Sequence, residues 1–263
     1  MPVSTPPKRG FVRQFYGAPQ DHPYGEQRWK NLLHEIQYAI THPSPHIPNY
    51  TIYVLGKENH RYVEGLGAQA VLVDPRPFLY PLRGQLHRNR LTCLQMAAKD
   101  FDEFVSLDWD CHPFIPIPDN FWERLAQKNA FQAPLTRYRY SKCPWRKVDG
   151  GLVPNASWMY FRDPTIPQQF NEIYEASQAQ TLSDGSEETV AAYWTDQQLG
   201  GWQGTEAYFQ HFETPFILTQ FSRTIFPHHL ETGKHRVFCH SHEWLIEKRQ
   251  ARLMKSIREK PYG

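Results

Sequence analysis

The chain has 263 residues, a formal net charge of +2, 40 % hydrophobic residues and 21 % charged residues. This length is sufficient for a large core in one sizeable domain, and so small a net charge does not require nucleic acid or a membrane surface as a partner. The four cysteines lack CxxC and disulfide-like spacing, and the sequence has neither a membrane-spanning apolar run nor a signal-peptide core. A cytoplasmic protein with reduced thiols is therefore expected.

The first part of the chain predicts strands and helices in alternation. Short runs rich in β-branched and aromatic residues alternate with segments of helical periodicity, and Gly or Pro separates them. The expected strands cover 10–17, 51–56 and 70–74, and the expected helices cover 23–40, 59–66 and 85–99. Strands and helices in this order are typical of a parallel α/β sheet.

The second part of the chain is less regular. Helical spacing of apolar residues predicts helices at 121–128 and 167–177, a glycine-interrupted helix at 194–202 and a basic amphipathic helix at 246–263. Alternating or apolar runs predict strands at 135–140, 154–162, 216–221 and 235–239, and 182–188 is expected to be a loop. The expected fold class is therefore α/β, with a mixed sheet flanked by helices.

The stretch from Phe104 to Asp110 carries the strongest chemical signal. An apolar, β-prone run ends there in two carboxylates, Asp108 and Asp110. Alternate side chains of a strand share a face, so both carboxylates can point the same way from its end. Carboxylates this close repel each other unless a cation lies between them, and Mg²⁺ or Mn²⁺ accepts oxygen ligands together with substrate phosphates. The pattern predicts a divalent metal that holds a diphosphate, although Asp-x-Asp is also common in surface turns.

A basic cluster precedes this strand. His87, Arg88 and Arg90 lie near the start of the expected helix 85–99, which leads directly to it. Ligands of open α/β sheets bind at the carboxyl ends of the strands, where the turn at Tyr16–Gly17 also falls. Basic residues at this edge suit a substrate that carries phosphates, and a solvated helix face is an equal alternative for each arginine.

Five short motifs follow one another along the chain. They are Arg90 in a helix, the strand that ends in Asp108-Trp109-Asp110, Asn155-Ala156-Ser157 before a strand, Asp196-Gln197-Gln198-Leu199, and His240 after the apolar run Val237-Phe238-Cys239. Together they resemble metal-dependent glycosyltransferases of the GT-A fold, most of all the retaining branch that includes glycogenin and bacterial galactosyltransferases. Trp158 replaces a glycine of that pattern, and the Gly-x-x-Lys-Pro before the last Trp is absent. The branch and the stereochemical outcome of transfer therefore stay open.

The resemblance implies the fold, the reaction and the cofactor. It implies a GT-A-like single domain over 1–263, with a nucleotide-binding half at 10–110, an acceptor and catalytic half at 111–245 and the C-terminal helix at 246–263. The implied reaction moves a sugar from a nucleoside-diphosphate sugar, with UDP expected, to an acceptor hydroxyl. Mn²⁺ or Mg²⁺ would stabilise the departing diphosphate as a Lewis acid.

The resemblance also implies site residues. The implied metal ligands are Asp108, Asp110 and His240, with His242 as the rival of His240. The implied donor-binding residues are Phe15, Tyr16, Gly17, Arg88, Arg90, Asp108, Trp109 and Asn155. The implied catalytic residues are Asp196 and Gln197, and a helix cap is the structural alternative for Asp196. Trp158, Trp194 and Trp202 are candidates either for an aromatic acceptor platform or for the core.

Other functions fit parts of the same pattern. A sugar-phosphate nucleotidyltransferase would use a similar fold and similar carboxylates, but the chain from 15 to 25 lacks the Gly-rich phosphate loop that such enzymes need. A non-catalytic nucleic-acid-binding protein would use the basic tail. A zinc hydrolase built on Cys239, His240 and His242 is the weakest alternative, because no HExxH-like spacing is present. The acceptor of a glycosyltransferase is expected to be a saccharide or a modified nucleic-acid base.

Overall fold

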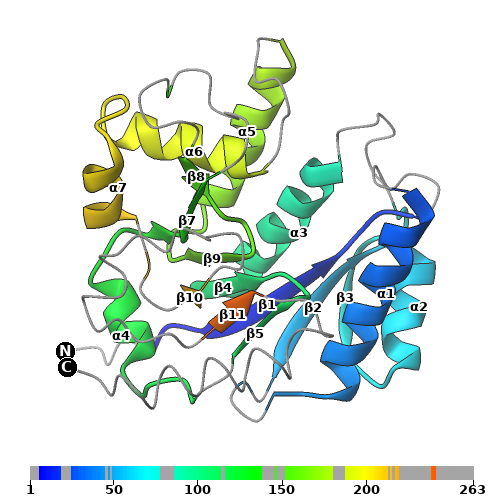
Figure 1. The fold of residues 1–263 in the computed structure, drawn as a ribbon. Helices are drawn as coiled ribbons and strands as arrows, with labels where there is room; N and C mark the ends of the chain where they lie inside the picture. Colours follow the sequence, from blue (N-terminus) through cyan, green and yellow to red (C-terminus); the bar gives the residue numbers. More distant parts are fainter. Residues whose placement is uncertain are drawn as a thin grey trace.

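A computed structural model gives the fold around a six-stranded mixed sheet (Figure 1). It describes residues 6–18, 25–44, 47, 49–77, 86–113, 116–137, 146, 152–179, 187–212, 214, 217–218 and 238–240. The strands of the sheet are β1 (Arg9–Phe15), β2 (Tyr50–Leu55), β3 (Ala70–Asp74), β4 (Glu103–Leu107), β6 (Phe131–Gln132) and β9 (Trp158–Phe161). The helices are α1 (Gly25–Thr41), α2 (Lys57–Gly65), α3 (Leu86–Asp100), α4 (Phe121–Ala126), α5 (Ile166–Ala179), α6 (Glu187–Gln198) and α7 (Thr205–His211).

The strand order places four carboxyl ends at one edge of the sheet. The order is β3-β2-β1-β4-β9-β6; the first four strands are parallel, and β9 runs antiparallel to both β4 and β6. The helices α1, α2 and α3 connect the parallel strands in chain order. The expected mixed α/β sheet is therefore confirmed, and the ends of β1, β2 and β4 lie where ligands bind in such sheets.

The other described strands form two small sheets. One joins β10 (Ile217–Leu218), β11 (Phe238–His240) and β5 (Cys111–Pro113), and the other joins β7 (Leu135–Arg137) and β8 (Leu152–Pro154). The strand β5 begins directly after the Asp-x-Asp stretch and pairs antiparallel with β11. This pairing links the middle of the chain to its C-terminal part.

The inner strands of the parallel half, β1, β2 and β4, are mostly buried on both faces, whereas the edge strand β3 is partly exposed. In β1, Val12 packs in the cluster that contains residues of α3, α5 and α6, whereas Phe15 packs with residues of α1 and α2. Figure 1 shows α1 and α2 beside each other, apart from the group formed by α3, α5 and α6. Phe11 and Val105 face a third cluster beneath α4. Burial on both faces explains why β2 and β4 consist mostly of apolar and aromatic residues.

The second half departs from expectation at α6. Glu187 and Glu188 were expected in a loop, but they form the first turn of α6, which ends at Gln198 instead of continuing to Trp202. The loop predicted for these two residues is therefore wrong. The helix dipole favours acidic side chains at a helix N-terminus, which explains their position in the first turn. The helix stops before Gly200, which has a φ of 72°.

Four short elements were not predicted from the sequence. The strands β5, β6 and β8 have only two or three residues each, which is too short for a recognisable pattern, and the helix α7 was also missed.

Several expected segments fall outside the described residues. They are the C-terminal helix at 246–263, His242, residues 138–140 of the strand expected at 135–140, and most of the strands expected at 216–221 and 235–239. Within the described part of the chain, every helix is too short or too polar to cross a membrane.

The turn between β2 and α2 should depend on Gly56. Its φ of 92° is a conformation that costs an L-residue about 1–2 kcal/mol, and an added Cβ would lie 2.7 Å from the Pro77 Cα. We expect Gly56→Ala to lower the free energy of unfolding by roughly 2–5 kcal/mol in a urea titration, since overpacking adds to the strain. Gly65→Ala is the matched control, because an added Cβ at Gly65 meets nothing within 4 Å. It should stabilise α2 slightly, and equal effects of the two variants would contradict this account.

Candidate functional site

The two carboxylates of the Asp-x-Asp stretch lie in a turn that follows β4. The strand ends at Leu107, and the Asp108 amide still donates to the Ser157 carbonyl oxygen at 2.9 Å. The chain then reverses, because the Cys111 amide donates to the Asp108 carbonyl oxygen at 3.0 Å. The turn, and not the alternation of a strand, therefore places Asp108 and Asp110. We call residues 108–111 the Asp108 turn.

Arg90 lies directly behind this turn. It is on α3 and only 3 % exposed, and its Nη2 lies 2.8 Å from Asp108 Oδ1. The same nitrogen donates to the Ala156 carbonyl oxygen at 2.6 Å, and Nη1 donates to Glu187 Oε1 at 3.0 Å. Burial lowers the pKa of the Arg90 guanidinium, but Asp108, Tyr16 and Glu187 more than offset this, so its pKa lies above the usual value. Arg90 is therefore a fixed positive charge at the carboxyl edge of the sheet.

Glu187 closes the other side of Arg90, and sequence reasoning missed it. It is the first residue of α6 and is buried, with its second carboxylate oxygen paired to His87 Nδ1. Burial raises the pKa of Glu187, but His87 and Arg90 lower it well below its ordinary value. The available signal was a Ser before two Glu residues, which is a helix N-terminal pattern. His87, Glu187, Arg90 and Asp108 thus form one continuous charged network.

The predicted residues at the end of β1 have different surroundings. Tyr16 is partly exposed and close enough to Arg90 and Asp108 to interact electrostatically, and burial raises the pKa of its phenol. Gly17 has a φ of 91°, and its carbonyl oxygen accepts from Asn59 Nδ2 at 2.9 Å. Phe15 is a core residue stacked on Trp29. Tyr16 and Gly17 therefore border the site, whereas the Phe15 side chain supports it from the core.

Trp109 anchors the Asp108 turn to β1. Its indole Nε1 donates to the Gln14 carbonyl oxygen at 2.8 Å, and its side chain is buried. The predicted donor-binding residue Trp109 therefore contacts the strand end, with its indole nitrogen already bonded to the backbone.

Asn155 and Arg88 are committed to other contacts. The Asn155 Oδ1 accepts hydrogen bonds from the amide and hydroxyl of Ser157, which shapes the turn between β8 and β9. That turn presents the Ala156 carbonyl oxygen to Arg90. Arg88 pairs with Glu175 on α5. Asn155 thus touches the network through its neighbour, and Arg88 joins α3 to α5.

The backbone brings His240 next to the Asp108 turn. His240 on β11 is the register partner of Cys111 on β5, and partners in an antiparallel pair have Cα atoms about 5 Å apart. For His240 the structure describes only the backbone. Among the side chains that it does describe, no group of three His, Cys, Asp or Glu residues is arranged to hold a metal. The proximity of residues 108, 110 and 240 is therefore inferred from the backbone pairing of β5 with β11.

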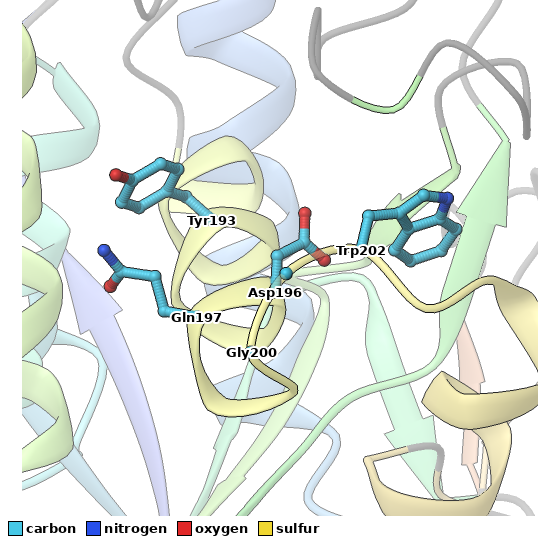
Figure 2. Close-up of a pocket in the computed structure, with 6 residues that line it drawn as sticks. Tyr193, Asp196, Gln197, Gly200 and Trp202 are labelled. Carbon is cyan, nitrogen blue, oxygen red and sulfur yellow. The ribbon is translucent and has the colours of Figure 1, made fainter.

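A second feature, a cavity of about 560 Å³, lies at the other end of α6 (Figure 2). Its lining residues come from the end of α6 and the turn after it: Tyr193, Asp196, Gln197, Gly200, Gly201 and Trp202. Figure 2 shows Tyr193 and Gln197 on one side of the helix, and the Asp196 carboxylate turned toward Trp202. Asp196 follows Glu187 by nine residues, which is about 13 Å of helix. The predicted catalytic pair therefore lies apart from the Arg90 network.

Asp196 forms a buried ion pair with Arg146, which sequence reasoning missed. Arg146 Nε lies 2.9 Å from Asp196 Oδ2, and Nη2 lies 2.5 Å from Oδ1. The guanidinium also lies 4.1 Å from the centre of the Trp202 ring. Asp196 lies in the last turn of α6, so it does not cap the N-terminus of that helix. The pair fixes the wall of the cavity.

The three candidate tryptophans separate into two groups. Trp158 is fully buried beneath α4. Trp194 packs edge-on against Phe131, Phe170 and Phe212, and its Nε1 donates to Gln169 Oε1 at 2.7 Å. Both are core residues, and Trp202 is the one of the three that lines the cavity.

Comparison with known proteins finds neither a matching family model nor a matching curated protein. Among solved structures, a glycosyltransferase involved in glycosylation of the major capsid of PBCV-1 gives a TM-score of 0.39 at 14 % identity, covering 95 % of this chain and 100 % of that one. Mouse xyloside xylosyltransferase 1 gives 0.39 at 11 %, covering 89 % and 97 %.

A CMP:2-keto-3-deoxy-manno-octonic acid synthetase complexed with CTP gives a TM-score of 0.38 at 11 % identity, covering 95 % of this chain and 99 % of that one. TM-scores and identities of this size support no assignment of function. The roles considered below therefore rest on the residues of this chain.

The buried Glu187 should make the fold sensitive to acid. Its folded pKa lies well below the ordinary value of 4.5, so its stabilising contribution is complete above pH 4.5 and is lost as the pH falls further. We expect wild type to lose more stability between pH 6 and pH 3 than Glu187→Gln, which starts less stable at pH 6. Urea unfolding at several pH values measures this difference. Glu188→Gln, which removes a partly exposed carboxylate from the same turn of α6, is the matched control; a loss in Glu187→Gln as large as the loss in wild type would contradict the assignment.

Proposed function

We propose that this protein is a glycosyltransferase that moves a sugar from a nucleoside-diphosphate sugar to a hydroxyl of a saccharide acceptor. The observation that carries the proposal is the pairing of β5 with β11, which brings His240 beside the Asp108 turn at the carboxyl end of β4. Asp108, Asp110 and the backbone of residue 240 then lie at one edge of a parallel sheet, beside the buried charge of Arg90. This is the arrangement that a metal-bound diphosphate would require.

The residues at the turn fit a divalent cation. The Asp108 side chain is 35 % exposed and Asp110 is partly exposed, so a hydrated ion can approach both carboxylates. Carboxylate oxygens and imidazole nitrogen are ligands that Mn²⁺ accepts, and Mg²⁺ accepts the oxygens. Asp108, Asp110 and His240 would hold the ion, which when bound would neutralise charge on the departing diphosphate.

Arg90 acts behind the carboxylates in this proposal. Its guanidinium is nearly inaccessible and already bonded to Asp108, Glu187 and Ala156. Its role is therefore to orient the Asp108 carboxylate and to supply a positive potential in a dry environment, where charges interact strongly. Tyr16 and Gly17, at the end of β1, would border the base and ribose of the donor.

The cavity at the end of α6 suits a saccharide. A volume of about 560 Å³ is within the usual range for a small-molecule site. Its aromatic walls, Tyr193 and Trp202, offer flat apolar surface, and Gln197 offers an amide for hydroxyl groups. Because about 13 Å of helix separates it from the Arg90 network, an acceptor bound there must extend toward the donor. An oligosaccharide meets that requirement, and Asp196, held by Arg146, would shape its pocket.

The remaining alternatives are distinguished by the ligand that binds. A nucleotidyltransferase uses a nucleoside triphosphate as its substrate. We therefore expect a nucleoside triphosphate, and not a nucleoside diphosphate, to stabilise such an enzyme. A nucleic-acid acceptor would depend on the basic segment 246–263, which lies outside the described residues. The cytoplasmic location expected from the sequence stays a prediction.

The metal assignment is tested by thermal shift with UDP and Mn²⁺. Ligand at about 100 times its Kd stabilises a protein by about 2.7 kcal/mol, which corresponds to a rise in Tm of roughly 5–10 °C for a chain of this size. We expect this rise in wild type and its loss in EDTA and in Asp110→Asn. Asp102→Asn is the matched control, because Asp102 is exposed at the opposite end of β4. A full shift in Asp110→Asn would remove Asp110 from the metal site, and a shift with CTP alone would favour the nucleotidyltransferase.

The acceptor pocket is tested by saturation-transfer NMR with methyl glycosides as probes. We expect Gln197→Ala to weaken binding by about 2- to 10-fold, the value of one neutral hydrogen bond, while the thermal shift with UDP and Mn²⁺ stays unchanged. Gln198→Ala is the control, since Gln198 is exposed on the same helix and lies outside the set of lining residues. Equal binding by both variants would remove the cavity from the proposal.

A further inference from the structure

Arg13 is a buried cation in the middle of β1. It is 1 % exposed, and residues 11–15 of the strand around it are all buried. Its neighbour Gln14 faces α3, because the Gln14 Oε1 accepts from the Ser106 hydroxyl at 3.2 Å and Ser106 contacts Arg90. Alternation along the strand therefore directs Arg13 to the opposite face.

The Arg13 side chain forms two hydrogen bonds with the backbone of the Asp108 turn. Its Nη1 donates to the Asp108 carbonyl oxygen at 2.5 Å, and its Nη2 donates to the Cys111 carbonyl oxygen at 2.8 Å. The two acceptors are the first and last residues of the turn. The planar guanidinium presents its two terminal nitrogens in a fixed fork, so this one side chain holds two carbonyl oxygens at a set spacing. The two bonds therefore fix the separation and orientation of the ends of the turn.

Two aromatic rings keep the guanidinium in place. Its central carbon lies 4.5 Å from the centre of the Tyr50 ring and 5.2 Å from that of Trp109. Trp109 is itself tied to β1 by its bond to Gln14. Within the described part of the chain, the partners of Arg13 are these rings and carbonyl oxygens, and no carboxylate is among them. A buried cation without an anion is costly, so an apolar residue would stabilise the strand more simply.

We propose that Arg13 is a positioning residue for the metal-binding turn, which it holds in the one conformation that presents Asp108 and Asp110 together. The proposal rests on the glycosyltransferase function inferred above. Arg13 acts on the backbone from one face of the sheet, whereas Arg90 acts on the Asp108 side chain from the other. Residues that support metal ligands in this way typically change metal affinity by about 10- to 100-fold when they are replaced.

The test compares Arg13→Met and Arg13→Lys with Arg162→Met. Arg162 is the matched control because it also donates to two carbonyl oxygens, those of Ala126 at 2.5 Å and Lys128 at 3.3 Å, but far from the turn. Two readouts need no turnover: hydrogen–deuterium exchange of peptides that cover 107–113, and binding of Mn²⁺ in the presence of UDP, followed by the EPR signal of free Mn²⁺. Melting temperatures show that each variant is folded under the conditions used.

We expect Arg13→Met to exchange faster at 107–113, with β2 and β3 unchanged, and to bind Mn²⁺ about 10- to 100-fold more weakly. Arg13→Lys, which keeps the charge but loses the fork, should fall between Arg13→Met and wild type. Arg162→Met should bind Mn²⁺ like wild type even if it melts at a lower temperature. Unchanged exchange at 107–113, or unchanged Mn²⁺ binding by folded Arg13→Met, would overturn the proposal.

The outcome for wild type separates this proposal from the proposed function. If wild type binds no Mn²⁺, the metal site itself is wrong, and the positioning of a metal by Arg13 is overturned with it. If wild type and Arg13→Met bind Mn²⁺ equally, the metal site stands and only the role of Arg13 is overturned. If Arg13→Met is too unstable to study, Arg13→Lys supplies the same comparison.

Discussion

The structure depends on how the Asp108 turn is held at the edge of the sheet. A turn after a buried strand is free to vary in conformation unless other contacts fix it. Here Arg90 bonds to the Asp108 side chain from the α3 face, and Arg13 bonds to the backbone carbonyl oxygens from the α1 face. Both arginines are almost fully buried. Two carboxylates therefore reach solvent from a turn whose support is hidden on both sides.

The helix α6 connects the two parts of the candidate site. Its first residue, Glu187, pairs with Arg90, and its last turn places Asp196 against Arg146. Both ion pairs are buried, so each carries a desolvation cost that only good geometry offsets. Breaking either pair would leave an uncompensated charge in the core. A buried ion pair thus fixes each end of α6. The length of the helix between them sets the distance between the Asp108 turn and the cavity at Trp202.

Much of the fold follows from local pattern, and the charged network does not. The strands and helices up to β4 were predicted within a few residues, because both-face burial and helical spacing leave clear periodicities. The start of α6 was missed because Ser, Asp and Gly before Glu187 also favour a loop. The distance between Asp196 and Asp108 was also not predictable, since it depends on how α6 packs and not on the order of motifs. The order of motifs assigned Asp108 to the metal and Asp196 to the transferring sugar and acceptor, and in the structure about 13 Å of helix separates Asp196 from Glu187 of the Arg90 network.

Arg13 shows what signal was available for the rest of the network. A charged residue inside a buried strand must find partners for its donors, or it destabilises the strand. The sequence therefore indicates that Arg13 has a specific partner, but it cannot say which, because backbone carbonyl oxygens are present at every position and leave no mark in the residue types. Asp108 and Asp110 are recognisable because their own side chains carry the chemistry. The residues that support them act through the backbone of the turn, and a folded chain is needed to identify them.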